Sequence, residues 1–470
     1  MSNVMRNDFV KKLIAGTACL AVMVQPLILG GCKNKDSASD KPADYGTYGS
    51  DIAREIAANF PNRRAYSTGE SQTGSYIEEK IKELGYEVEV QTFQGTGGTS
   101  KNYIVRVEGT GFYCAKEDGT FVLEHRTAII GAHYDSALSS EFTEEEETDE
   151  EEYDEEEYDE EYDEEYDEET EETSETVLTY SHDGISDNAS GTACVLTALM
   201  AFKEYKDVAY DVWFVFFGAS SDNFAGAAAF YQSLTNDEKE SIDVMYDIDS
   251  LYAGDKVYAS SGYSSLREGK RYEMRRKLYQ AYDVCFGNTL YTNYGFDLYY
   301  NESGVKDDVN GDKLRDIFNE MPNKVSDFKV FDDVMIPIVY FESYEYNFTS
   351  LDQMKETKNL SLQEYDGIIR GTPADSMALL DSVLIEEDKD RDGDGEIDCT
   401  GDKLQIRINC VAFIVVESLL KGSDKGMTPA QYDVYRTEGT KETTGVSESV
   451  QTSQTELTAY TAEPPLTSET

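Results

Sequence analysis

The sequence predicts an α/β fold, a three-layer α/β/α sandwich around a mixed, mostly parallel central sheet. Short apolar runs that end in glycine and polar residues occur at 128–136 (AIIGAHYDS) and 212–223 (VWFVFFGASSDN). Such runs are typical of buried strands that open into loops. Helical and strand patterns alternate up to 336–341 (IPIVYF), so helices should cover both faces of the sheet. Because open α/β sheets bind ligands beyond the carboxyl ends of their strands, a site is expected where these runs end.

The first predicted elements are two amphipathic helices between Ser50 and Gly85, where apolar residues recur at helical spacing. We expect them to end at Pro61 and Gly85. Alternating patterns then predict strands at 86–93, 103–109 and 126–135. A helix over 190–205 and a central strand over 212–217 follow. One domain, residues 50–421, accounts for most of the chain.

The amino terminus is typical of a bacterial lipoprotein signal peptide, residues 1–31. Scattered basic residues precede an apolar segment, Leu13 to Leu29, that ends in Leu-Gly-Gly-Cys at Cys32. The alternative is a transmembrane anchor, but the segment is short and contains Gln25 and Pro26. Acylation of Cys32 would anchor the protein on the extracytoplasmic face of the cell membrane, with 32–49 as a polar tether.

The charge of the chain is concentrated in one insertion. Of the formal charge of −53, the run 141–176 supplies 25 carboxylates, and subtracting them leaves −28. This run lies in an insertion at 138–178 that is expected to be disordered. It is either a solvated segment without a role, a screen over the site, or a segment that captures cations. Nucleic acid is excluded as a partner, because the chain is so acidic.

The cysteines predict no disulfide framework. Seven are present, and five remain after signal removal and acylation of Cys32. An odd, sparse set of this kind is not a scaffold, although Cys399 and Cys410 could pair.

One histidine and several aspartates at strand ends suggest a metal site. His133 and Asp135 follow the first apolar run, Asp187 lies in the next loop, and Asp249 ends the run VMYDID. Imidazole and carboxylates suit zinc, and Asp135 could hold the His133 ring in place without binding the metal itself. The alternative is that His133 is a hydrogen-bonded core residue and that the aspartates are caps.

In their order, four motifs resemble the zinc-dependent aminopeptidases of clan MH, whose relatives include glutaminyl cyclases and the transferrin-receptor ectodomain. The motifs are GAHYDS (131–136), SDNASG (186–191), FFGASSDNFAG (216–226) and YDIDS (246–250), and the resemblance runs from about Asp51 to Val383. It implies that His133 and Asp249 each hold a metal and that Asp187 bridges two.

The chain departs from this family where the chemistry takes place. The paired glutamates of the family, the general base and a ligand, fall on Ser220 and Ser221. The last histidine ligand falls on Gly371 in Gly-Thr-Pro-Ala-Asp, with 348–352 as a poorer alternative. One metal thus loses both of its exclusive ligands, which predicts a degenerate site with one weakly held zinc or none.

Two charged neighbours could compensate for these losses. A one-residue shift of the loop could bring the Asp222 carboxylate into the position of the base. Arg370, which precedes Gly371, is expected to replace the lost metal by pairing with Asp187. The alternative for Arg370 is a side chain that points to solvent.

Two carboxyl-terminal segments complete the prediction. The insertion 384–402 resembles an EF-hand loop, with Gly395 at the turn but Gly401 where glutamate is usual. It is either a calcium site or merely an acidic loop; a similar pattern at 308–312 is weaker. Residues 422–470 are expected to be a disordered tail. The calcium ligands would be Asp390, Asp392, Asp394, Glu396 and Asp398.

Two functional hypotheses remain. In the first, a membrane-anchored lipoprotein with an aminopeptidase-like domain binds a peptide, a metal or a protein partner without hydrolysis. In the second, it is an active metallo-aminopeptidase with a rearranged site. The fold favours the enzyme and the site residues favour the binder.

Overall fold

The computed structural model describes residues 39, 41–142, 182–267, 272–302, 306–307, 316–317, 324–348, 350, 353–390, 399–423 and 425–444. The expected signal peptide with Cys32, nearly all of the acidic insertion and the segment 308–312 lie outside these residues. So do four of the expected calcium ligands, Asp392, Asp394, Glu396 and Asp398. The predictions for these segments stay predictions.

The described residues form a central sheet of eight strands in the order β1-β2-β6-β5-β7-β12-β8-β9. Strands β6, β5, β7 and β12 run parallel, whereas β1, β2 and β8 pair in antiparallel fashion and β9 is parallel to β8. The sheet is therefore mixed and mostly parallel, as predicted. The strands are β1 (Glu89–Gln94), β2 (Thr99–Val107), β5 (Thr127–His133), β6 (Asp211–Phe217), β7 (Ile242–Asp249), β8 (Lys256–Ser260), β9 (Leu298–Tyr300) and β12 (Ile338–Tyr344).

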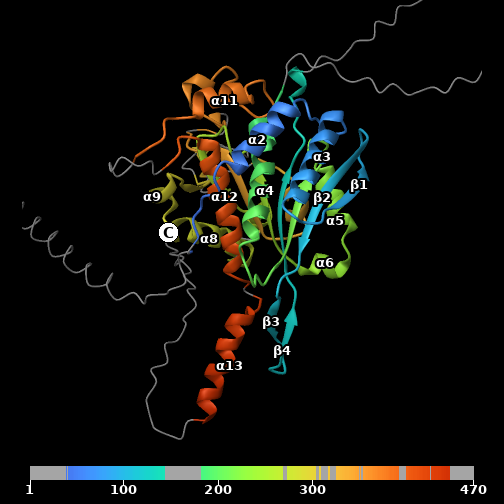
Figure 1. The fold of residues 1–470 in the computed structure, drawn as a ribbon, viewed down its shortest axis with the longest axis vertical. Helices are drawn as coiled ribbons and strands as arrows, with labels where there is room; N and C mark the ends of the chain where they lie inside the picture. The colour runs from blue at the N-terminus through green and yellow to red at the C-terminus, as the bar shows by residue number, and fades with distance from the viewer. Residues whose placement is uncertain are drawn as a thin grey trace, which may run out of the picture.

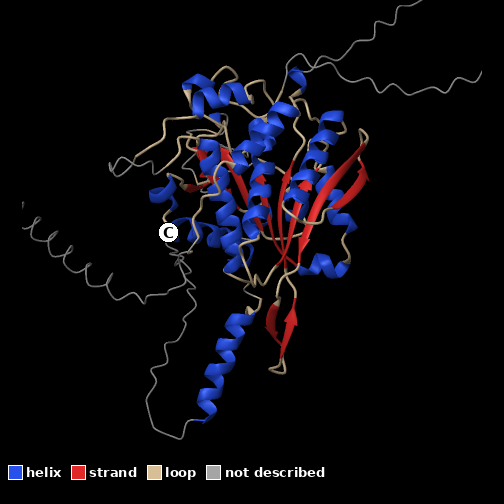
Figure 2. Ribbon diagram, in the orientation of Figure 1, coloured by secondary structure: helices blue, strands red, loops and turns tan. Residues whose placement is uncertain are grey.

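Two hydrophobic cores lie on opposite faces of this sheet. Along β5, Ala128 and Ile130 pack into one core, and Ile129 between them packs into the other, because successive side chains of a strand point to opposite faces. Helices cover both faces (Figures 1 and 2). The three-layer α/β/α sandwich is thus confirmed.

The larger core is covered by α2 (Tyr48–Asn59), α3 (Thr68–Glu83), α4 (Gly191–Phe202), α8 (Tyr272–Gly287) and α12 (Lys403–Leu420), and the smaller by α5 (Ala225–Ser233) and α10 (Phe328–Asp332). Helices α2 and α3 are the two predicted amphipathic helices; the Ser67 side chain caps α3 by accepting from the Glu70 N–H. The shorter elements are α6 (Asn236–Ser241), α7 (Tyr263–Arg267), α9 (Leu290–Tyr294), α11 (Met377–Leu384), β10 (Lys306–Asp307) and β11 (Asp316–Ile317).

Both ends of the described chain are more ordered than expected. Ala43, in the expected tether, is buried in the core. In the expected tail, Pro429–Thr444 form helix α13 beside the hairpin of β3 (Phe112–Ala115) and β4 (Phe121–Glu124) (Figure 1). There the Tyr113 and Tyr432 rings stack with centroids 4.0 Å apart. The tail prediction is therefore wrong for this stretch, because aromatic contacts give the helix a partner.

Two further findings concern the cysteines and the helices of the described residues. Cys399 and Cys410 are both buried and neither is in a disulfide, so the bond considered between them does not form. No helix in the described ranges is both long and apolar enough to span a bilayer.

Candidate metal-binding site

The candidate site lies at one edge of the sheet because four parallel strands end there. Strand β5 ends at His133 and β7 ends at Asp249. Glu342 of β12 is paired with Asp249 in the register of the sheet. Strand β6 ends at Phe217 and leads into the loop that carries Ser220. The parallel arrangement thus brings together residues that are far apart in the sequence.

His133, Asp187 and Asp249 converge as the motif order suggested. The Nε2 atom of His133 lies 3.4 Å from Asp187 Oδ1 and 3.5 Å from Asp249 Oδ1, and all three residues are buried. Within the described residues they form the one cluster with metal-ligand geometry. Zinc bonded tetrahedrally at 2.0–2.2 Å separates its ligand atoms by roughly 3.3 Å. Asp187 Oδ1 is buried without a hydrogen bond, so the three residues fit a single zinc ion.

His133 is oriented by Asp135, though through its backbone. The Nδ1 atom lies 3.0 Å from the Asp135 carbonyl oxygen and 3.7 Å from its carboxylate. This contact leaves Nε2 directed at the aspartates. Burial alone would lower the pKa of His133, but the carboxylates of Asp135, Asp249 and Asp187 raise it well above its usual value.

The loop that carries Asp187 is held by two buried residues. The Asp375 carboxylate accepts hydrogen bonds from the N–H groups of Ser186 and Asp187, at 2.8 and 2.9 Å. Arg63 donates to the carbonyls of Tyr134, at 2.9 Å, and Gly184, at 2.6 Å. The loop is therefore tied both to the end of β5 and to the segment after Gly371.

The two serines at the glutamate positions have no carboxylate, and each donates its hydroxyl to a neighbouring aspartate. Ser220 Oγ donates to Asp327 at 2.8 Å, and Ser221 Oγ donates to Asp135 at 2.7 Å. Asp222 does not replace them. Its carboxylate accepts from the Tyr66 hydroxyl and from the N–H and hydroxyl of Thr96, in the turn between β1 and β2. The possible loop shift is absent because these donors hold the Asp222 carboxylate in the turn between β1 and β2.

Gly371, at the position of the last histidine, could not simply be replaced by histidine. Its φ is +73°, and a Cβ there would lie 2.8 Å from Ser139 Oγ. A side chain at this backbone conformation is strained. Within the same motif, Asp375 does reach the Asp187 loop, which supports the alignment over the alternative at 348–352.

Arg370 enters the site but pairs with a different carboxylate than predicted. Its Nη1 atom donates to Asp249 Oδ2 at 3.0 Å, so the predicted pairing with Asp187 is wrong. Burial raises the pKa of Asp187, although the charge of Arg370 acts to lower it. Sequence order placed Arg370 near both carboxylates but could not show which one lies within hydrogen-bonding distance.

Comparison with known proteins identifies the domain. Residues 119–371 match the model of Peptidase family M28, more than half of the 470 residues. The chain belongs to peptidase family M28. This confirms the resemblance to the clan MH aminopeptidases. The alkaline phosphatase isozyme conversion protein of Escherichia coli K12 is 22% identical over 230 residues, 48% of this chain and 56% of that protein. The chain thus spans about half the length of this curated relative.

Solved structures with a similar arrangement include two enzymes. A zinc aminopeptidase from Bacillus subtilis is 12% identical, with a TM-score of 0.47 over 80% of this chain and 95% of its own. A glutaminyl cyclase from an Acidobacteriales bacterium is 15% identical, with a TM-score of 0.46 over 82% and 98%. At these scores neither likeness adds to the family assignment.

Three further carboxylates of this M28 site escaped the sequence analysis: Asp247, Asp327 and Glu342. All three are fully buried. Burial raises the pKa of Asp327 and that of Glu342 to about 7, and it raises the pKa of Asp247 well above its usual value. Asp247 precedes Asp249 by two residues on the same strand, and Glu342 follows the apolar run IPIVYF, so strand alternation was a usable signal for both. Asp327 lies in no motif.

Proposed function

We propose that this M28 domain binds a ligand without hydrolysing peptides and holds at most one zinc ion, weakly, at His133, Asp187 and Asp249. The main support is that the positions of the second metal's two exclusive ligands hold Ser221 and Gly371. Ser221 is bonded to Asp135 and Arg370 is paired with Asp249. A guanidinium keeps its charge at all physiological pH values, so it neutralises Asp249 without binding water as a metal would.

The missing base is the second ground for a non-catalytic role. A bound zinc would supply a Lewis acid at the three ligands. The serine hydroxyl at position 220 accepts no proton near neutral pH, so it could not activate a water molecule. The residues of the chain orient His133, hold Asp187 and neutralise Asp249. That set of tasks suits the binding of a metal or of a peptide or protein ligand.

Titration of zinc into the metal-free, detergent-purified protein tests this proposal. Excess calcium in the buffer would keep zinc from binding to the acidic run 141–176. Calorimetry should then show at most one zinc site that depends on His133, because His133→Ala removes the imidazole ligand. His125→Ala is the matched control, since His125 is exposed and paired with Asp211. Two zinc sites that both vanish in His133→Ala would contradict the proposal.

We propose further that the protein is a lipoprotein on the extracytoplasmic face of the membrane. The support is the Leu-Gly-Gly-Cys sequence that ends at Cys32 after an apolar segment. Cys32→Ser removes the residue that is acylated. The variant should therefore lose its lipid anchor, and it should be found either as a precursor with the signal peptide uncleaved or in the soluble fraction. Metabolic labelling with a palmitate analogue should mark the wild type and not Cys32→Ser; equal labelling of both would overturn the assignment.

A second candidate function, an active aminopeptidase with a rearranged site, is favoured by Asp327. Its carboxylate accepts from Ser220 Oγ, the group at the position of the family's base, and its Oδ1 atom is buried without a partner. A general base works best with a pKa near the operating pH, and the pKa of Asp327 is about 7. Turnover by the unmodified protein decides between the two candidates.

A further inference from the structure

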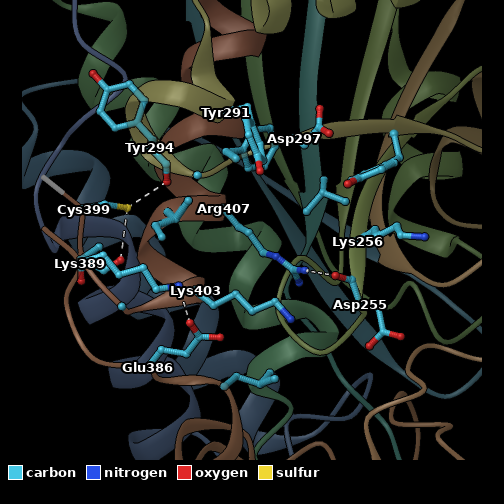
Figure 3. Close-up of a pocket in the computed structure, with 18 residues that line it drawn as sticks. Asp255, Lys256, Tyr291, Tyr294, Asp297, Glu386, Lys389, Cys399, Lys403 and Arg407 are labelled. Carbon is cyan, nitrogen blue, oxygen red and sulfur yellow. Dashed lines mark hydrogen bonds and ion pairs between the residues drawn. The ribbon is translucent and has the colours of Figure 1, made fainter. Parts of the chain in front are cut away.

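A cavity apart from the metal-binding site lies between the start of α12, helix α9 and strands β8 and β9 (Figure 3). Its volume is 260 Å³, room for several water molecules or for one small ligand. None of His133, Asp187, Asp249 and Arg370 lines it. The cavity therefore needs an account of its own.

Arg407, on the wall of the cavity, is a buried cation that forms no ion pair with a carboxylate of the described residues. Its guanidinium donates to the carbonyl oxygens of Leu251 at 2.9 Å, Tyr252 at 2.8 Å, Gly254 at 2.9 Å and Asp255 at 3.1 Å. Carbonyl groups satisfy its hydrogen bonds but carry no net charge. Within the described residues the Asp255 carboxylate acts on Arg407 through its charge, but it forms no ion pair with the guanidinium.

Lys403 places a second cation beside the first. It lies four residues before Arg407, so both project from one face of α12, and both extend toward the loop at Asp255 (Figure 3). Its one hydrogen bond within the described residues is to the Gly254 carbonyl, at 3.3 Å, and an ammonium has three donors. Burial, and then the charge of Arg407, lower the pKa of Lys403 to about 7.

Three acidic residues line the cavity, and two of them, Asp255 and Glu386, are bonded elsewhere; the third is Asp297. Asp255 accepts from the Thr357 hydroxyl at 2.6 Å and from the Lys358 N–H at 2.8 Å. Glu386 is paired with Lys389 at 2.5 Å. Neither Lys403 nor Arg407 forms an ion pair within the described residues, and two adjacent cations without a direct carboxylate contact are an incomplete electrostatic arrangement. An anion would complete it.

We propose that this cavity binds a small oxyanion, a carboxylate or phosphate group, with Lys403 as the direct ligand. The ammonium of Lys403 has donors left for the anion, whereas Arg407 contributes its charge and fixes the loop 251–255. That loop follows Asp249 at the end of β7. The cavity is a second ligand site of this M28 domain, and it does not depend on a metal at the first.

Calorimetric titration with sodium phosphate, and separately with sodium acetate, at constant ionic strength tests this proposal on the full-length protein. The wild type should bind at least one of the two in a saturable manner. Lys403→Met should weaken binding about tenfold or more, since a hydrogen bond to a charged group contributes roughly 1.5–3 kcal/mol. Lys403→Arg keeps the positive charge and should retain much of the affinity of the wild type.

Two controls keep the test sharp. Lys82→Met makes the same charge change at an exposed residue paired with Glu78 and should leave binding unchanged. His133→Ala should also leave it unchanged, which separates this site from the proposed zinc site. Thermal melting shows that each variant is folded. Binding of phosphate alone identifies a phosphorylated ligand, and binding of acetate alone a carboxylate ligand. Absence of saturable binding by the wild type, or equal affinity in folded Lys403→Met, would overturn the proposal.

Discussion

The unmodified protein is expected to hydrolyse aminoacyl chromogenic substrates at the background rate. Loss of a positioned general base costs about a hundredfold to ten-thousandfold in rate. The Ser220 hydroxyl donates a hydrogen bond to Asp327 and cannot take a proton from water near neutral pH. Ser221 and Gly371 replace the two exclusive ligands of the second metal, and Arg370 is paired with Asp249. Steady-state assays with and without a chelator measure this directly.

Restoring both glutamates, Ser220→Glu with Ser221→Glu, should not rescue hydrolysis. Gly371 still provides no imidazole, and the new carboxylates would lie beside Asp135 and Asp327, which now accept from these serines. Like charges at short range are unfavourable, so the double variant should also be less stable. Ser75→Glu, on the exposed side of α3, controls for added charge. Chelator-sensitive turnover by the wild type, lost in Asp327→Asn, would establish the enzyme with Asp327 as its base.

Arg370→Ala is expected to destabilise the protein by about 3 to 5 kcal/mol, the usual cost of leaving one member of a buried ion pair alone. The stranded charge would be Asp249, whose side chain is 2% exposed and lies 3.0 Å from the Arg370 guanidinium. Urea unfolding of the metal-free protein measures the change. Zinc should recover part of the loss, because a cation at His133, Asp187 and Asp249 would neutralise the same carboxylate.

Lys329→Ala is the control for Arg370→Ala. Lys329 pairs with Asp333, and the two side chains are 42% and 53% exposed, so removing it should cost no more than about 1 kcal/mol. Arg370→Lys keeps the charge, so its loss of stability should lie between the losses in Arg370→Ala and Lys329→Ala. Equal stability of Arg370→Ala and Lys329→Ala would show that Asp249 does not depend on Arg370.

The fold and the three candidate ligands could be predicted because parallel strands gather their carboxyl ends at one edge. His133 and Asp249 each end an apolar run, and the family motifs place Asp187 between them. Alternation along these strands also fixes which residues face each core, as Ala128 and Ile129 show. These features depend on local periodicity and on motif order, and both can be read from one sequence.

The partners of the charged groups could not be predicted in the same way. Arg370 reaches Asp249 rather than Asp187, and Asp222 is held by Tyr66 and Thr96; both outcomes depend on the path of loops that carry no periodic pattern. Asp327 lies in no motif, yet the fold places it against Ser220. Helix α13 was missed because its support is a stacked ring, Tyr113, from a distant hairpin.

Elemental analysis of the protein as purified tests the central claim most directly. We expect no more than one zinc ion per chain, lost in His133→Ala and retained in His125→Ala, with background hydrolysis by the same sample. Two zinc ions per chain, both lost in His133→Ala, together with chelator-sensitive hydrolysis, would contradict the account of a one-metal, non-catalytic M28 domain.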